Sequence, residues 1–178
     1  MGPLTAPGKL WNWLKTLAIA AILALFIREN LLAFYVVDGN SMSPTLVNGQ
    51  LVAVNKLVYK FHPPRRGDVV VFVTRGNAFG PGPERVFIKR VIAVPGDTVA
   101  IANGAVFLNG EPLHEEYIDT AVHGEMEPVA VDDGMVFLMG DNRRPGGSWD
   151  SREYGPVPMT SVLGRAELIL FPIPGKVD

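Results

Sequence analysis

Two segments of this 178-residue sequence hold side chains whose chemistry stands out, one that begins at Ser41 and one around Lys89. Ser41 begins the polar segment 41–46 (SMSPTL), and Lys89 lies inside the apolar segment 86–94 (VFIKRVIAV). Burial disfavours the charged form of an amine, so a lysine in an apolar strand is pushed towards its neutral form. A neutral lysine can take the proton of a serine hydroxyl and activate it as a nucleophile. Taken singly, the segments also fit a Ser-Pro turn and a lysine that protects a sheet edge.

A third polar region directly follows a predicted strand at 135–139. It consists of residues 140–143 (GDNR) and 148–152 (SWDSR). Taken alone, it predicts a polar loop at the end of a strand that holds an Asp–Arg pair. In the strand predicted at 86–94, alternate residues share a face, so Phe87, Lys89 and Val91 are expected to point the same way.

Other common catalytic or metal-binding patterns are missing from the sequence. It has no cysteine, which excludes disulfides, thiolate zinc sites and cysteine nucleophiles. His62, His114 and His123 lack the spacing of metal ligands and are expected at the surface. The acidic pairs Glu115-Glu116 and Asp132-Asp133 are expected to be solvated turns, and the Ser41 segment does not match the nucleophile motif G-x-S-x-G. We therefore expect neither a metal nor a cofactor.

Together and in this order, these segments resemble those of the bacterial type I signal peptidases. The resemblance runs over nearly the whole chain, behind an N-terminal apolar segment. The matching segments are 41–46 (SMSPTL), 66–72 (RGDVVVF), 89–97 (KRVIAVPGD), 140–143 (GDNR) and 148–152 (SWDSR).

The resemblance implies a serine endopeptidase that removes signal peptides from secreted pre-proteins through an acyl-enzyme. By this resemblance Ser41 is the nucleophile, Lys89 is the general base, and Ser148 is the hydroxyl that orients the lysine amine, with Ser151 as the alternative. The backbone N–H of Ser41 is expected to be the main oxyanion donor, because Gly39 offers no side-chain hydroxyl. The residues matching a supporting polar network are Arg90, Asp141, Asn142, Arg143, Asp150 and Arg152.

The resemblance also implies small apolar pockets for the substrate residues one and three positions before the cut. Such pockets accept Ala or another small residue and reject larger side chains, which gives an Ala-x-Ala preference. The residues expected to line them are Tyr35, Val37, Met42, Phe87 and Ile88.

The N-terminal region predicts a membrane anchor. Residues 17–27 are all apolar, and extension back to Leu10 gives a segment long enough to span a bilayer. The alternative, a cleavable signal peptide, is disfavoured because no good cleavage site follows. We expect a cytoplasmic tail at 1–9, a single transmembrane helix at 10–28 and an extracytoplasmic catalytic domain, because the lysines precede the apolar run.

Membrane lipid is therefore an expected partner, through an apolar patch of Tyr35, Val37, Phe79 and Trp149 at the mouth of the cleft. Nucleic acid is not expected, because the net charge is −2.

The remaining sequence predicts a mainly β fold, an antiparallel sheet or barrel-like catalytic domain behind one N-terminal transmembrane helix. Short β-branched runs alternate with Gly- and Pro-containing turns, and no helical period follows residue 35. The expected strands are 50–55, 68–74, 86–94, 135–139 and 166–171, with a hairpin pair around 105–108 and a loop at 76–84. The expected organisation is a catalytic β core at 34–97 and 135–174, with a small β insertion, a reduced second domain, at 98–134.

Three other classes of protein share part of this pattern. Self-cleaving transcriptional repressors share a Ser–Lys pair, but they need a DNA-binding domain with a basic surface, which this sequence lacks. Signal peptidases of the endoplasmic-reticulum type use a histidine where this chain has Lys89. A catalytically inactive, membrane-anchored β protein that binds peptides remains the main alternative.

Overall fold

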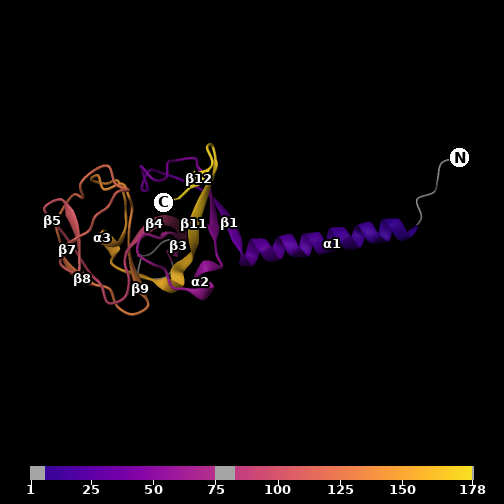
Figure 1. The fold of residues 1–178 in the computed structure, drawn as a ribbon, viewed down its shortest axis with the longest axis horizontal. Coiled ribbons are helices and arrows are strands. Elements are labelled where there is room, and N and C mark those ends of the chain that lie inside the picture. Colours follow the sequence, from indigo (N-terminus) through magenta and orange to yellow (C-terminus); the bar gives the residue numbers. More distant parts are fainter. Residues whose placement is uncertain (1–6, 75–82, 178) are drawn as a thin grey trace.

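A computed structural model describes residues 7–74 and 83–177 of the chain. A helix, α1 (Pro7–Asn30), leads into a domain made mostly of antiparallel strands, and Figure 1 shows this helix extending away from the β domain. Among the described residues, no helix combines the length and the hydropathy of a membrane span. The expectation of a mainly β fold behind an N-terminal helix is confirmed.

The larger sheet has eight strands. Its order is β1 (Leu32–Val36), β2 (Leu51–Asn55), β11 (Val162–Phe171), β3 (Val69–Thr74), β4 (Arg85–Ala93), β9 (Met135–Met139) and β10 (Val157–Pro158), and β12 (Gly175–Lys176) pairs with β11. All these pairings are antiparallel. Among the described residues β1 and β10 do not pair, so this sheet is open and the barrel-like expectation does not extend to a closed barrel.

The smaller sheet has four strands, in the order β7 (Glu111–Pro112), β6 (Ala105–Leu108), β5 (Thr98–Ala102) and β8 (Met126–Ala130). The turns that flank β6 each carry Asn-Gly with a positive φ at both residues, 51° and 79° at Asn103-Gly104 and 56° and 87° at Asn109-Gly110. These left-handed conformations suit Asn and Gly and match the twist of a tight hairpin. The predicted hairpin around 105–108 is therefore present.

The two sheets share a hydrophobic core. Ile92 of β4 and Phe137 of β9 pack in one buried cluster with Val99, Ile101 and Val106 of the smaller sheet. Two further clusters fill the larger sheet, one on each face of β3, because Val69 and Val71 belong to one cluster and Val70 and Phe72 to the other. The smaller sheet thus packs against β4, which contains Lys89, and against β9, which precedes the polar segment 140–143.

The structure also contains elements that the sequence patterns did not predict. These are the strands β1, β8, β10 and β12, the short helices α2 (Val58–Phe61) and α3 (Ser151–Tyr154), and the 3-10 turn η2 (Met159–Ser161). Short helical turns therefore do occur after residue 35, although no helical period in the sequence indicates them. One-turn helices leave too few residues for a hydrophobic period to register. Most of the loop predicted at 76–84 lies outside the described residues.

Candidate active site

Lys89 and Ser41 are brought into direct contact, although they come from different parts of the larger sheet. Ser41 lies in the turn region between β1 and β2, and Lys89 lies in β4. The Nζ atom of Lys89 donates a hydrogen bond of 2.6 Å to Ser41 Oγ and another of 3.0 Å to the carbonyl oxygen of Ile88. Lys89 is 1% exposed, so its amine is shielded from water.

Burial lowers the pKa of the Lys89 amine to about 8. The loss of hydration destabilises the charged form, and this effect outweighs the nearby carboxylates of Asp150 and Asp141, which raise the pKa. The ring of Phe87 adds an apolar surface, since Lys89 Nζ lies 5.6 Å from its centroid. A substantial neutral fraction near physiological pH is the condition for this amine to accept a proton.

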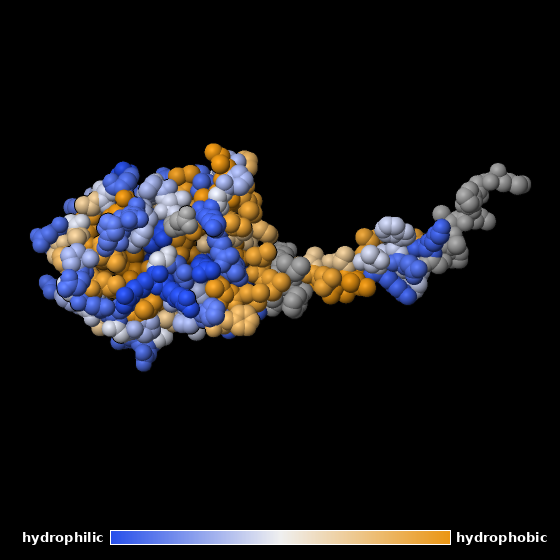
Figure 2. All heavy atoms as spheres, in the orientation of Figure 1, coloured by the Kyte–Doolittle hydropathy of each residue, from blue (hydrophilic) through white to orange (hydrophobic). Residues whose placement is uncertain are grey.

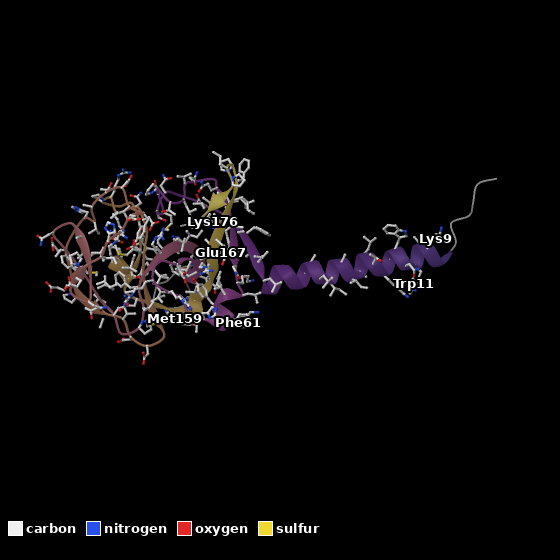
Figure 3. The ribbon with its side chains drawn as sticks, viewed as in Figure 1. Lys9, Trp11, Phe61, Met159, Glu167 and Lys176 are labelled. Carbon is white, nitrogen blue, oxygen red and sulfur yellow. The ribbon has the colours of Figure 1, made fainter. Side chains whose placement is uncertain are left out.

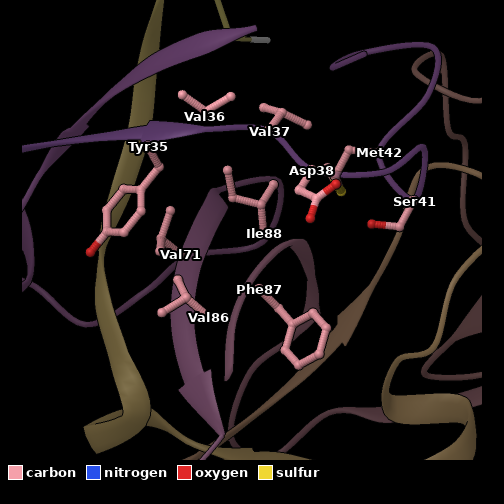
Figure 4. Close-up of a pocket in the computed structure, with 10 residues that line it drawn as sticks. All are labelled: Tyr35, Val36, Val37, Asp38, Ser41, Met42, Val71, Val86, Phe87 and Ile88. Carbon is pink, nitrogen blue, oxygen red and sulfur yellow. The ribbon is translucent and has the colours of Figure 1, made fainter. Parts of the chain in front are cut away.

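A cavity of about 140 Å³ lies beside the Ser41 hydroxyl, between β1 and β4 (Figure 4). The five residues expected to line the substrate pocket all lie on its wall: Tyr35, Val37, Met42, Phe87 and Ile88. Four residues that were not expected complete it: Val36, Asp38, Val71 and Val86. Apart from Asp38, Ser41 and the tyrosine hydroxyl, the lining is apolar, which suits small hydrophobic side chains.

The loop at 140–143 holds the Ser41 loop in place by three hydrogen bonds. The backbone N–H of Asn142 donates to the Ser41 carbonyl at 3.1 Å, and its side-chain amide donates to the Asn40 carbonyl at 3.0 Å. The hydroxyl of Thr45 donates to Asp141 at 2.6 Å. Asp141 in turn accepts two hydrogen bonds from Arg90, at 2.9 and 2.8 Å, and both side chains are buried.

Ser148 and Ser151 occupy different environments. The Oγ of Ser151 accepts a hydrogen bond of 3.0 Å from the backbone N–H of Leu138, so it holds the backbone near the end of β9. The Oγ of Ser148 is buried and forms no hydrogen bond of good geometry among the described residues, although the Ser148 side chain lies close enough to the Asp150 carboxyl to help lower its pKa. It packs on the Cα of Gly140, where the Ser41 carbonyl also lies.

Asp150 fixes the other side of Gly140. Its carboxylate accepts from the Gly140 N–H at 3.0 Å and from two nitrogens of Arg152, both at 2.8 Å. Burial raises the pKa of this carboxyl, but the paired guanidinium outweighs burial and the pKa is lowered. Asp150 is therefore charged and caps α3, where it accepts from the Arg152 N–H.

Of the expectations about charged residues, the one for Glu115 was wrong. Glu115 was expected in a solvated turn, but its side chain is 4% exposed and pairs with the fully buried guanidinium of Arg143. The Asp–Arg pair expected in the polar region at 140–152 forms between Asp150 and Arg152, whereas Asp141 pairs with Arg90 and Arg143 with Glu115. A contact between residues 28 apart leaves no local signal in the sequence, so Glu115 could not have been found that way.

The histidines lie where the sequence predicted. His62, His114 and His123 are exposed, and His114 contacts only the exposed Glu116 among the charged residues described. No group of three or more His, Asp or Glu side chains within the described ranges could hold a metal ion.

A serine hydroxyl that contacts a buried amine, at the edge of an apolar cavity, is the arrangement of a hydrolase that acts by nucleophilic attack. A family model described as signal peptidase, peptidase S26, matches residues 10–171. The chain belongs to this family, and its activity is that of signal peptidase I, a serine hydrolase that removes signal peptides.

Known proteins similar to the chain include a probable signal peptidase I-1 of Synechocystis, 39% identical over 96% of this chain and 87% of the relative. A signal peptidase I of Bacillus caldolyticus is 35% identical over 93% of this chain and 91% of the relative. A crystal structure of a signal peptidase I from Enterococcus faecalis has a TM-score of 0.48 and 27% identity, and covers 58% of this chain and 97% of that one.

Proposed function

We propose that this chain cleaves signal peptides with Ser41 as nucleophile and Lys89 as general base. The observation that carries the proposal is the 2.6 Å contact between the buried Lys89 amine and the Ser41 hydroxyl. Lys89 takes the hydroxyl proton as Ser41 Oγ attacks the scissile carbonyl. The protonated amine then gives that proton to the leaving amine, which departs and leaves an acyl-enzyme. Water deprotonated by Lys89 hydrolyses the ester and restores Ser41.

The backbone N–H of Ser41 is the proposed oxyanion donor. It donates to no acceptor among the described residues, so it is available to the developing negative charge. Gly39 has a φ of +94°, a conformation that disfavours residues with a side chain, and its N–H is taken by Asn48. A side-chain donor from position 39 is therefore not part of the proposal.

Ser148 is the proposed orienting residue for Lys89. Its hydroxyl is buried against Gly140 and forms no hydrogen bond of good geometry among the described residues, whereas Ser151 accepts from the backbone N–H of Leu138. The supporting network divides into two parts: Arg90, Asp141 and Asn142 hold the Ser41 loop, and Arg143, Asp150 and Arg152 hold Gly140.

The proposed substrates carry small residues one and three positions before the cut. The cavity beside Ser41 has a volume of about 140 Å³, and two of the residues that line it, Met42 and Val37, are buried at 1% and 7% exposure and cannot move aside freely. An Ala side chain fits such a space, and fixed walls limit the size of the side chain that can enter. This supports an Ala-x-Ala preference.

We further propose that residues 10–28 form a single-pass membrane anchor, with the tail at 1–9 in the cytoplasm and the catalytic domain outside it. Members of the signal peptidase family are membrane-associated. The helix exposes apolar side chains along its length, among them Leu17, Ile19, Ile22, Leu23 and Leu25. Figure 2 shows this hydrophobic part in the half of the helix nearer the β domain and the hydrophilic part towards the N-terminal end, where Figure 3 places Lys9.

Membrane lipid is the proposed partner of the β domain as well, but through a different patch from the one expected. Val37 is buried and is therefore not part of an exposed patch, and Phe79 lies outside the described residues. Exposed apolar side chains instead gather on β1, β11 and the β11–β12 turn, on the side facing α1 (Figure 2): Phe34, Val36, Leu168, Leu170, Phe171 and Ile173. Nucleic acid is not a proposed partner.

The proposed domain organisation assigns catalysis to a β core at 34–97 and 135–174, and makes 98–134 a small insertion. The four-stranded sheet falls within the insertion, and all strands of the larger sheet fall within the core except part of β1 and the short β12 at 175–176.

A cleavage assay tests the function. Full-length protein in detergent is incubated with a pre-protein whose signal peptide ends in Ala-x-Ala, and mass spectrometry identifies the new N-terminus. The wild type is expected to cut after the second Ala, and a substrate with Phe in that place should stay intact. Binding of the pre-protein without any cleavage would instead support the inactive peptide-binding alternative.

A further inference from the structure

Glu115 reaches the catalytic core from the segment between β7 and β8. Its two carboxylate oxygens accept from the two terminal nitrogens of Arg143, at 2.8 and 2.5 Å. Both side chains are almost fully buried, at 4% and 0% exposure. Burying an ion pair is costly unless its geometry is good and its other polar atoms are satisfied, so this pair differs in kind from the exposed pair Arg144–Asp119 close by in the sequence.

The third donor of Arg143 connects this ion pair to the nucleophile. Arg143 Nε donates to the carbonyl oxygen of Gly140 at 2.8 Å. The Cα of Gly140 packs against the Ser148 hydroxyl and the Ser41 carbonyl with no space to spare. A shift of the Arg143 guanidinium would therefore move the peptide on which both serines rest.

Tyr117 provides a second connection from the same segment. Its hydroxyl donates to Glu115 at 2.6 Å, and the Arg90 guanidinium lies 3.9 Å above its ring. Arg90 holds Asp141, which binds Thr45 in the nucleophile loop. Glu115 and Tyr117 thus contact both arginines that fix the two ends of the 140–143 loop.

We infer that Glu115, supported by Tyr117, is a positioning residue for the reaction, acting through Arg143 and Gly140 on the geometry of Ser41. The insertion that carries the smaller sheet is then part of the catalytic apparatus, because it supplies the counter-charge that locks the loop beneath the nucleophile. Without Glu115 a buried guanidinium loses its partner and must turn towards water or another acceptor, and Gly140 moves with it. This inference rests on the proposed Ser41 chemistry.

The test compares Glu115→Ala with Glu116→Ala in the full-length protein. Glu116 is the neighbouring glutamate, with an 86% exposed side chain, so it controls for the loss of a negative charge at the same place in the sequence. We expect Glu115→Ala to lower kcat by about 10²-fold with KM within about 3-fold of wild type, because small displacements of reacting groups have effects of this size. Glu116→Ala should stay within about 2-fold in both constants.

Two further variants separate positioning from folding. Glu115→Gln keeps the size of the side chain and one acceptor oxygen, and it should recover part of the kcat lost in Glu115→Ala. The double variant Glu115→Ala/Arg143→Ala should have a kcat no lower than that of Arg143→Ala alone, because the two residues act in series. All assays are run well below each variant's Tm. If Glu115→Ala fails to fold, Tyr117→Phe, which removes only the hydroxyl bond to Glu115, must show the kcat loss, by at least about 3-fold.

A folded Glu115→Ala protein with wild-type kcat would overturn the inference, as would additive losses in the double variant or, where Glu115→Ala does not fold, a fully active Tyr117→Phe. Ser41→Ala is assayed in parallel. If Ser41→Ala retains cleavage, the proposed function fails; if it is inactive while Glu115→Ala is fully active, only the positioning role of Glu115 fails.

Discussion

Gly140 packs directly against the hydroxyl of Ser148, and a methyl group on its Cα would overlap with both that hydroxyl and the Ser41 carbonyl. A side chain at position 140 is thus excluded by the two serines that lie closest to the reaction. A glycine is required at position 140 because Ser148 and Ser41 approach its Cα closely, and not because of an unusual backbone conformation, since the φ of Gly140 is not positive.

Gly140→Ala is therefore expected to lower kcat/KM by about 10²-fold or more, since Ser41 is backbone-bonded to the same loop and must move. Overpacking should also lower the stability by about 1–3 kcal/mol. The matched control is Gly175→Ala, where a Cβ meets nothing within 4 Å and φ is not positive. Equal activity of the two variants in a peptide-cleavage assay would show that the packing at Gly140 does not control the site.

The pH dependence of cleavage should report the pKa of Lys89, which burial lowers to about 8. The amine must be neutral to accept the Ser41 proton, so kcat/KM is expected to fall below about pH 8, by roughly 10-fold for each further pH unit. A kcat/KM profile from pH 5 to 11 measures this limb. Activity that rises only above pH 10 would mean that Lys89 is solvated and is not the base.

Stability should depend on the titration of the same amine and, like activity, should increase with pH. Because the pKa of Lys89 is lower in the folded state than its usual 10.5, the unfolded state binds more protons between about pH 8 and 10.5. The stability of the wild type is thus expected to rise with pH in this window. Lys89→Met, which has no charge to bury, should lack this rise and be more stable at pH 7, by up to about 3 kcal/mol, while losing activity. Denaturant unfolding of the wild type and of Lys89→Met at pH 7 and 10 measures the rise in stability and the effect of the substitution. A Lys89→Met protein less stable than the wild type at pH 7 would contradict this account.

Removal of residues 1–30 should separate anchoring from chemistry. The truncated protein is expected to cut short peptides at a near wild-type rate, because Ser41 and Lys89 are held by the β domain. Its cleavage of membrane-inserted pre-proteins should fall far more, since the anchor raises the effective concentration of enzyme and substrate. Liposome flotation of the same protein tests the apolar surface around Phe34 and Phe171. Absence of flotation with intact peptide cleavage would argue against a membrane-docking surface on the β domain.

The parts of the fold that could be predicted are those encoded by a pattern of a few consecutive residues. The β-branched run of β3 and the Asn-Gly turns around β6 each encode a strand or hairpin within a few residues. β10 and β12 have two residues each, too few for an alternating pattern, so they could not be predicted.

The candidate site was accessible from the sequence where single residues stand out against their surroundings. Lys89 is conspicuous because it interrupts an apolar strand, and its burial follows from that pattern. Glu115 has the opposite character: it lies in a polar stretch, and only the three-dimensional position of Arg143 makes it a buried counter-ion. The acidic pair at 115–116 therefore divides into one buried and one exposed carboxylate, which no local rule distinguishes.

The most direct test of the proposed chemistry is a cycle of kcat/KM measurements on Ser41→Ala, Lys89→Ala and the double variant, with Ser43→Ala as the control. A catalytic pair acts as a unit, so each single variant should abolish cleavage with the fold intact, and the double variant should be hardly worse than either. Ser43→Ala should remain active, because Lys89 bonds to Ser41. Retention of more than a few per cent of activity in Lys89→Ala, or independent losses that multiply in the double variant, would contradict the pairing of Ser41 with Lys89.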